Sequence, residues 1–341
     1  TVDLGSAELE TDQDSDSAFA GLIAGTGSLV KLGSGILSLT GANTFSGGTT
    51  LGEGTLRLED DDAIGTGALT ATGGTLDYDD GIDLSNDIDL RANTNLNVTI
   101  GAATQSGNIG ETGGSFGIVK TGIGSLELTG TSSFTGGITV NGGDLIGNTA
   151  NLVGDIGITG GTVEFDQASA GAFTGEITGT GRLVKSGEGE IVFSGSGIEA
   201  DYFYVRGMGT VLDGVAVDIA NRLDISNQLE SGGTTDAGLT IRGGANVTSG
   251  EGRIGDIDGF EAAVTVSGAG STWTIGEVAD PTSFRVAGEG AASLLVEEGA
   301  KVEVIGSASV HSLNGGAASS VAITGENSLF DVSGLLDIGG A

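Results

Sequence analysis

The stretch from Leu29 to Leu58 reads LVKLGSGILSLTGANTFSGGTTLGEGTLRL and contains the pattern that decides the fold. Its apolar residues alternate with other residues in short runs, as at Leu37/Leu39, and glycines separate the runs. Alternation places one face of a strand in a core and the other in water. The glycines mark turns where the backbone needs a positive φ. The stretch therefore predicts short strands joined by tight turns, and no helix.

The same pattern returns along the chain. The segment from Phe19 aligns without a gap with the segment from Phe173, and a shorter copy begins at Ile118. A different unit fills the second half, where the segment from Val264 is repeated from Val321. Strands this short cannot each close a core, so successive turns of the chain must stack on one another. We therefore expect an all-β protein, a parallel β-helix of roughly 14–18 rungs.

The repeats suggest four segments. We expect an acidic N-terminal segment or cap at 1–18 and a β-helix with K-x-G-x-G-x-L-x-L repeats at 19–195. An irregular join with an aromatic cluster follows at 196–235. The last segment, 236–341, is expected to be a β-helix with G-x-x-S-x-[WF] repeats that is truncated at its C-terminus. Four aromatic residues at repeat positions are expected to face inward: Phe45, Phe134, Trp273 and Phe330.

Composition excludes several classes of protein. The 341 residues include 67 Gly, one Pro and no Cys, and the formal net charge is -34. Glycine does not recur at every third position, so the chain is not collagen, and 38% hydrophobic residues argue against a disordered acidic tail. Without cysteine there is no disulfide or thiolate metal site. A charge this negative repels nucleic acid, so we expect no nucleic-acid partner.

The run from Leu29 to Leu58 resembles the autotransporter-associated β-strand repeat, found in passenger domains of type V secretion. It matches K-x-G-x-G-x-L-x-L-x-G, then N-T-F-x-G-G-T-T and G-x-L, almost throughout. The run VTVSGAGSTWTIGE, which begins at Val264, is similar to the G-S-x-W repeats of the same passenger class. The resemblance implies a right-handed parallel β-helix and an outer-membrane β-barrel in cis, absent from this sequence. It also implies a place on the bacterial cell surface, or release, and most often adhesion.

Acidic residues form three clusters, at 12–16, 59–62 and 77–89. Oxygen ligands at short spacing could bind Ca²⁺, but neither the EF-hand loop nor the G-G-x-G-x-D repeat is present. We therefore favour a solvated acidic face with no metal and no cofactor, and keep Ca²⁺ as the alternative. The acids retained as candidate binding residues are Asp60, Asp61, Asp62, Asp79 and Asp80.

The cluster Tyr202-Phe203-Tyr204 interrupts the repeat. Such a patch is either a binding site or a core plug between two kinds of repeat. We favour the plug and keep Tyr202 and Tyr204 as candidate binding residues.

Three lysines occupy equivalent repeat positions, Lys31, Lys120 and Lys185. They could form a basic stripe for anionic ligands, or they could sit at strand ends and offset nearby acids. In so negative a chain the second interpretation is favoured.

Catalysis has little support in the sequence. His311 is the only histidine, and no G-x-S-x-G elbow is present. We expect an adhesive passenger and no enzyme. It would bind passengers on neighbouring cells, as in biofilm, or a host matrix protein or glycan. The alternatives are a glycan hydrolase or lyase with paired carboxylates and a passive spacer.

Overall fold

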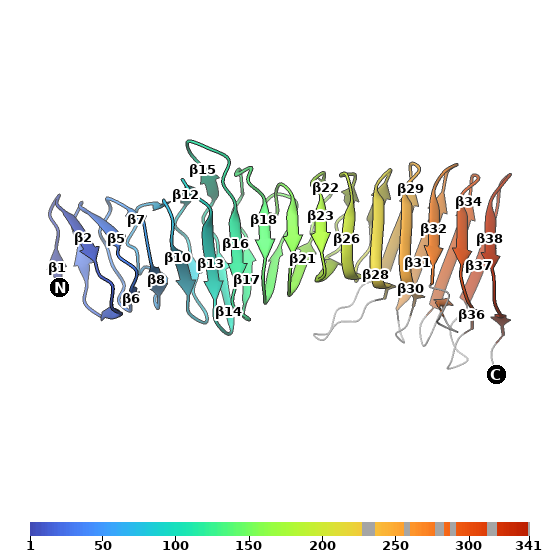
Figure 1. Ribbon diagram of the computed structural model, residues 1–341, viewed down its shortest axis with the longest axis horizontal. Coiled ribbons are helices and arrows are strands. Elements are labelled where there is room, and N and C mark those ends of the chain that lie inside the picture. Colours follow the sequence, from blue (N-terminus) through green and yellow to red (C-terminus); the bar gives the residue numbers. More distant parts are fainter. Residues whose placement is uncertain (227–235, 256–259, 277–282, 287–290, 312–318, 340–341) are drawn as a thin grey trace. The chain divides into compact units, whose positions relative to one another are not determined.

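The computed structural model describes residues 1–226, 236–255, 260–276, 283–286, 291–311 and 319–339. Within these ranges the chain forms 39 β-strands and no helix, so no described helix could cross a membrane. Packing divides the chain into two compact units, Thr1–Val163 and Glu164–Ala341. Both are stacks of parallel strands wound into successive coils (Figure 1), and the parallel β-helix predicted from the sequence is confirmed. Each unit is described in turn.

Unit 1 stacks its strands in three parallel columns. The first column contains β2 (Glu8–Asp12), β5 (Ser28–Leu32), β7 (Thr49–Leu51), β9 (Leu69–Ala71), β12 (Ile88–Leu90) and β15 (Ile109–Glu111). The second contains β3 (Ser17–Phe19), β6 (Ile36–Leu39), β8 (Thr55–Leu58), β10 (Thr75–Tyr78), β13 (Thr94–Val98), β16 (Ile118–Thr121), β18 (Ile138–Val140) and β20 (Ile156–Ile158). The third contains β11 (Asp83–Leu84), β14 (Ala102–Gln105), β17 (Ser125–Leu128) and β19 (Asp144–Gly147).

The register of these columns places like residues above one another. Leu56 of β8 lies between Leu37 and Leu76 in the neighbouring strands, and all three are buried. Each coil thus adds apolar side chains to continuous interior ladders, which is how strands of three to five residues share one core. Phe45 and Phe134 are 0% and 2% exposed, so both face inward as predicted.

Unit 2 begins and ends with short strands and has three long ones between them. Its first column contains β22 (Gly171–Phe173), β25 (Ile191–Phe193), β27 (Thr210–Asp213), β29 (Ala237–Arg242), β31 (Glu261–Ser267), β34 (Ala291–Glu297) and β37 (Ser319–Ile323). Opposite it, β23 (Ile177–Gly179) and β24 (Arg182–Ser186) both pair with the long strand β26 (Ile198–Val205). Next come β28 (Ala216–Ile225) and β30 (Asn246–Ile254). Beyond β30 there are again two columns, β32 (Thr272–Ile275), β35 (Lys301–Val304) and β38 (Leu329–Val332), and β33 (Phe284–Val286), β36 (Ala308–Val310) and β39 (Leu336–Ile338).

Aromatic rings fill the interior of unit 2. Phe165 contacts Phe173 and Phe193 edge to face at 5.1 and 5.5 Å between ring centroids. Trp273 is fully buried as predicted and contacts Phe284, which also contacts the half-buried Phe330. Edge-to-face pairs add stability beyond the area they bury, so these rings strengthen the contacts between neighbouring coils.

The K-x-G-x-G motif forms a sharp corner whose lysine is buried. Lys120 Nζ donates hydrogen bonds to the carbonyl oxygens of Thr121 and Gly124 at 2.8 Å, and of Gly122 and Gly142 at 3.3 Å. The side chain is 0% exposed. The corner turns at Gly122, whose φ is +77°, and a Cβ there would collide with the carbonyl of Val98 on the preceding coil. This explains why the motif pairs a lysine with glycines. The glycine corner points backbone carbonyls toward the interior, and the lysine ammonium group donates hydrogen bonds to them.

The same arrangement recurs at the other two lysines, both 0% exposed. Lys31 Nζ donates to the carbonyls of Leu32 and Gly33 at 2.7 and 2.8 Å, and Lys185 Nζ donates to those of Gly187 and Met208. Burial lowers the pKa of Lys120 and of Lys185 to about 8, and lowers that of Lys31 as well. The exposed stripe was wrong, because all three side chains are buried. The lysines do lie near strand ends, and nearby acids such as Asp144 and Asp166 act to raise their pKa against the effect of burial, as the second interpretation has it, but their hydrogen bonds go to backbone carbonyls.

Candidate functional site

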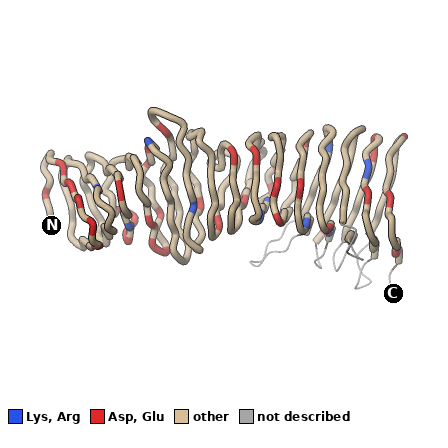
Figure 2. The backbone as a smooth tube through the Cα atoms, viewed as in Figure 1, with Lys and Arg blue, Asp and Glu red and all other residues tan. Residues whose placement is uncertain are grey.

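The five candidate aspartates lie together at one edge of unit 1. Asp60, Asp61 and Asp62 follow β8, and Asp79 and Asp80 follow β10, its neighbour in the second column. Asp60 is half-buried and the other four are exposed. These five residues are called the acidic corner below. Asp and Glu are spread along both units, whereas Lys and Arg are few (Figure 2).

Several acids also hold the turns together. Asp61 Oδ1 accepts a hydrogen bond from the backbone N–H of Asp83 at 2.8 Å, and Asp80 Oδ1 accepts one from Ala102 at 2.9 Å. Asp14 does the same for Ser34, and this hydrogen bond lowers the pKa of the Asp14 carboxyl group. Each of these carboxylates satisfies an N–H of the following coil that no strand partner reaches. In the sequence this role is visible only as a spacing of about one coil between each aspartate and the N–H group that it binds.

No group of three or more His, Cys, Asp or Glu residues in the described part of the chain is arranged to hold a metal ion. The acidic corner is therefore a surface of negative charge, and a role for Ca²⁺ there stays a prediction. His311 is half-buried at the end of the described segment 291–311.

The Tyr-Phe-Tyr cluster divides between the two faces of β26. Phe203 is 0% exposed and packs against Phe193 at 6.0 Å between centroids. Tyr202 and Tyr204 point to the outer face, half-buried, with their rings stacked at 6.0 Å and 11°. The core plug predicted for the cluster is thus correct for Phe203 and wrong for the two tyrosines. The two-residue period of a strand is the signal that separates them.

Arginines stand at both ends of the tyrosine stack. The Arg182 guanidinium lies 5.7 Å from the centre of the Tyr202 ring, and that of Arg206 lies 5.4 Å from Tyr204. These distances are typical of cation–π contacts. Arg222 of β28 lies directly opposite Tyr202, and Arg253 and Arg285 lie directly opposite each other on the next two strands. The arginine–tyrosine patch is defined by these residues: Arg182, Tyr202, Tyr204, Arg206, Arg222, Arg253 and Arg285.

Glu251 forms two ion pairs within this patch. Its Oε2 is 2.8 Å from Arg222 Nε and 3.2 Å from an Arg253 nitrogen. Burial would lower the pKa of Arg222, but the hydrogen bond and charge of Glu251 outweigh it, so that pKa is raised. A second acid, Asp224, lies opposite Tyr204 and Arg253, and its charge also raises the pKa of Arg222. The sequence analysis missed these arginines because they are far apart in the chain and only the coil brings them together.

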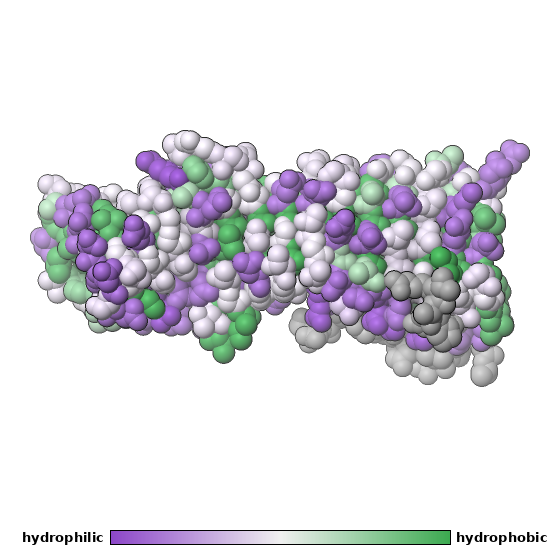
Figure 3. Space-filling model, viewed as in Figure 1, coloured by the Kyte–Doolittle hydropathy of each residue, from purple (hydrophilic) through white to green (hydrophobic). Residues whose placement is uncertain are grey.

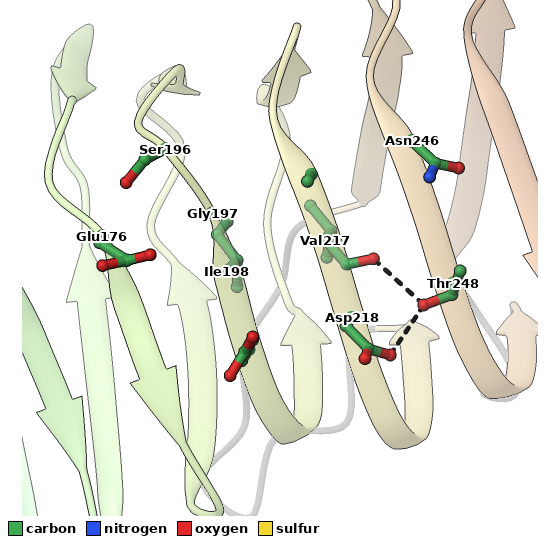
Figure 4. A pocket seen from close by; sticks show the side chains of 10 residues that line it. Glu176, Ser196, Gly197, Ile198, Val217, Asp218, Asn246 and Thr248 are labelled. Carbon is green, nitrogen blue, oxygen red and sulfur yellow. Dashed lines mark hydrogen bonds between the residues drawn. The ribbon is translucent and has the colours of Figure 1, made fainter.

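The same long strands carry an acidic pocket at their other ends. It has a volume of about 330 Å³ and includes the carboxylates of Glu176, Glu199 and Asp218 among its lining residues (Figure 4). Thr248 Oγ donates to Asp218 at 2.7 Å. Register shifts between Ala200 and Tyr202 in β26, and in β28, separate the pocket from the patch.

The coils carry the repeat of a known class of secreted protein. A family model described as passenger-associated-transport-repeat matches residues 29–58 and 118–146, the two stretches that contain Lys31 and Lys120. This confirms the resemblance to autotransporter passengers. A passenger is displayed on the bacterial cell surface or released, and this is the location of the chain.

Among curated proteins the chain is similar to the adhesin BmaC autotransporter of Brucella suis biovar 1 (strain 1330). The two are 33% identical over 214 residues, which cover 54% of this chain and 6% of the relative. The chain thus spans a small part of that protein's length. No solved structure matches the chain significantly.

Proposed function

We propose that this chain is an adhesive segment of an autotransporter passenger that attaches a bacterium to neighbouring cells or to a host surface. The observation that carries the proposal is the coil itself, whose outer faces display polar and acidic side chains on successive rungs. The face shown in Figure 3 is largely hydrophilic or neutral, with hydrophobic residues in small patches. Similarity to a protein named an adhesin supports the same function. Many weak contacts along such a face add through multivalency without a deep pocket.

The net charge of the chain determines how salt would affect contact between two copies. With a net charge of -34, two copies repel each other at low ionic strength. Contact between two purely acidic faces would therefore strengthen as salt or divalent cations are added. A requirement for Ca²⁺ would appear in the same experiment, as association that Ca²⁺ supports and salt alone does not.

The settling of bacteria that display the full-length parent protein tests the proposal. Cells with and without it are compared across salt concentrations, with and without Ca²⁺, and in binding to immobilised matrix proteins and glycans. Faster settling or specific attachment of the displaying cells is the expected result. Equal behaviour in every condition would refute adhesion and leave the passive spacer.

The acidic pocket of unit 2 supports a second candidate, a glycan-acting enzyme. Three carboxylates line it, and paired carboxylates are the machinery of glycoside hydrolysis. Glu199→Gln would abolish turnover of a glycan if the pocket were catalytic. An adhesive face made of many contacts would lose little from the same change, so one variant separates the two functions.

A further inference from the structure

The acidic pocket owes its shape to a gap in a row of outward side chains. Figure 4 shows Gly197 between Glu176 and Asp218, and a Cβ at Gly197 would lie 3.7 Å from Glu176 Oε1. Ala216, on the adjacent strand β28, is also small and lines the pocket. Small residues flanked by acids leave a depression of about 330 Å³, which is at the lower end of the range for small-ligand sites.

The side chains around the pocket accept more hydrogen bonds than they can donate. Glu176, Glu199 and Asp218 supply carboxylates, which only accept hydrogen bonds when they are ionised. The Thr248 hydroxyl donates its proton to Asp218 at 2.7 Å, so its oxygen can otherwise only accept. Among the lining residues that the structure describes, none is Lys, Arg, His or an aromatic residue. A complementary ligand therefore carries several donors and a positive charge.

The chain itself supplies no cation to this pocket. Glu199 and Asp218 lie directly opposite each other, and neither forms an ion pair within the described ranges. The segments outside these ranges contain no Lys, Arg or His. Glu303 and Asp331 are opposed in the same way but lie outside the pocket, so an opposed pair of acids by itself does not mark a site. What distinguishes Glu199 and Asp218 is the pocket beside them, which gives a cation from outside the chain room to bind.

We propose that the acidic pocket binds a lysine or arginine side chain of a basic protein on the surface to which the bacterium attaches. The proposal rests on the adhesive function and names the class of partner. Both side chains carry donors and no acceptors, and their carbon stems can lie across Gly197 and Ala216. A second copy of the chain is a poor partner, since its net charge is -34 and three of its four lysines are buried.

The arrangement of the acceptors favours a basic side chain over a metal ion or a sugar. No group of three or more His, Cys, Asp or Glu residues in the described ranges is arranged to hold a metal ion, so the carboxylates line the pocket without converging on one point. A side chain with several N–H groups can reach separated acceptors, whereas a single ion cannot. A sugar hydroxyl both donates and accepts, and the lining side chains offer few donors.

Two variants of the purified 341-residue chain test the pocket, one by its shape and one by its charge. Gly197→Val fills the gap and keeps every carboxylate, and the backbone is not strained because Gly197 has no positive φ. Glu199→Gln removes one charge and nearly keeps the shape. Glu303→Gln is the matched control, since Glu303 is an exposed acid opposed to another acid outside the pocket. Far-UV circular dichroism verifies that each variant folds.

The probe is fluorescein-labelled hexalysine, whose binding is measured by fluorescence anisotropy. In about 0.15 M salt the Debye length is about 8 Å, so attraction to distant acids is screened. We expect Gly197→Val and Glu199→Gln each to bind hexalysine at least about fivefold more weakly than the parent. Glu303→Gln should bind within about twofold of the parent, because it loses the same charge outside the pocket. Hexalysine with acetylated side chains has lost its ammonium groups and should not bind.

Three outcomes would overturn the proposal. Equal binding of hexalysine by the parent and both pocket variants would show attraction to the acidic surface as a whole. Binding of spermine as tight as that of hexalysine, and lost in the same variants, would assign the pocket to a free polyamine. Release of sugar from a glycan by the parent, abolished in Glu199→Gln, would assign the pocket to catalysis.

Cells that display the full-length parent protein report on adhesion separately. If these cells attach to a surface, and the purified pocket variants bind hexalysine as the parent chain does, adhesion stands and only the role of the pocket fails. If the cells do not attach, but the variants lose hexalysine, the pocket binds basic side chains and the adhesive function fails.

Discussion

Replacing Lys120 with methionine tests the structural meaning of the repeat motif. Methionine has nearly the same length but no donor, so it leaves the carbonyls of Thr121 and Gly124 without their 2.8 Å hydrogen bonds. Each buried acceptor left unsatisfied costs about 1–3 kcal/mol. The substitution also removes a buried charge, which offsets part of this cost. Burial lowers the pKa of Lys120 from 10.5 to about 8, which corresponds to a penalty of about 3 kcal/mol for the charged form. Because the carbonyls of Gly122 and Gly142 lose their longer hydrogen bonds as well, four acceptors are left unsatisfied, and their cost exceeds this offset. We expect the free energy of unfolding of unit 1 to fall by about 2–4 kcal/mol.

Urea unfolding followed by far-UV circular dichroism measures this loss, and thermal unfolding measures it independently. For a unit of this size a loss of 1 kcal/mol lowers Tm by about 2–4 °C, so Lys120→Met should lower Tm by about 5–10 °C. Lys301→Met is the matched control, because Lys301 is exposed on β35 and its change should stay within about 0.5 kcal/mol. Equal effects of the two substitutions would refute the idea that the corner lysine satisfies the turn.

Three further predictions follow from the interior. The folded chain loses the protons of Lys120 and Lys185 above a pH of about 8, whereas the unfolded chain keeps them until about 10.5. The free energy of unfolding measured by urea titration should therefore rise between pH about 8 and 9.5, by about 2 kcal/mol for each lysine, and a flat profile would contradict buried ammonium groups. Gly122→Ala should destabilise unit 1 by more than about 1 kcal/mol. Gly157 has no positive φ, and a Cβ there would meet only the Ile138 carbonyl at 4.0 Å, so Gly157→Ala should be nearly neutral in the same urea titration. Tyr78→Phe removes the 2.8 Å hydrogen bond to Gln105 in the core and should cost about 1–2 kcal/mol by thermal unfolding, and an unchanged Tm would show that the amide finds another partner.

The sequence predicts the interior of this protein well because the interior is repetitive. Each inward position packs against equivalent positions on the coils before and after it. Alternation and spacing are therefore enough to predict that Phe45, Phe134 and Trp273 are buried. The corner lysines show the limit of this reasoning. Charge and position in the chain suggest the surface, but the backbone turn creates carbonyls that only a buried cation satisfies.

The outer faces are harder to predict because nothing on them has to repeat. The acidic corner could be located, since its aspartates are close together in the sequence. The arginine–tyrosine patch could not, since its arginines range from Arg182 to Arg285 and meet only through the register of adjacent strands.

The long strands β26, β28 and β30 give unit 2 a broader outer face than the short coils have. The other described strands have at most seven residues and most have three to five, so they present few outward side chains before the chain turns. These three strands have eight to ten residues each, so their outer face carries several rows, with the acidic pocket at one end and the arginine–tyrosine patch at the other. Opposite charges on one sheet face can orient a partner as well as hold it. A surface that distinguishes between partners has room to form where the short repeat is broken, whereas the regular coils supply the repeated polar contacts of the proposed adhesive face.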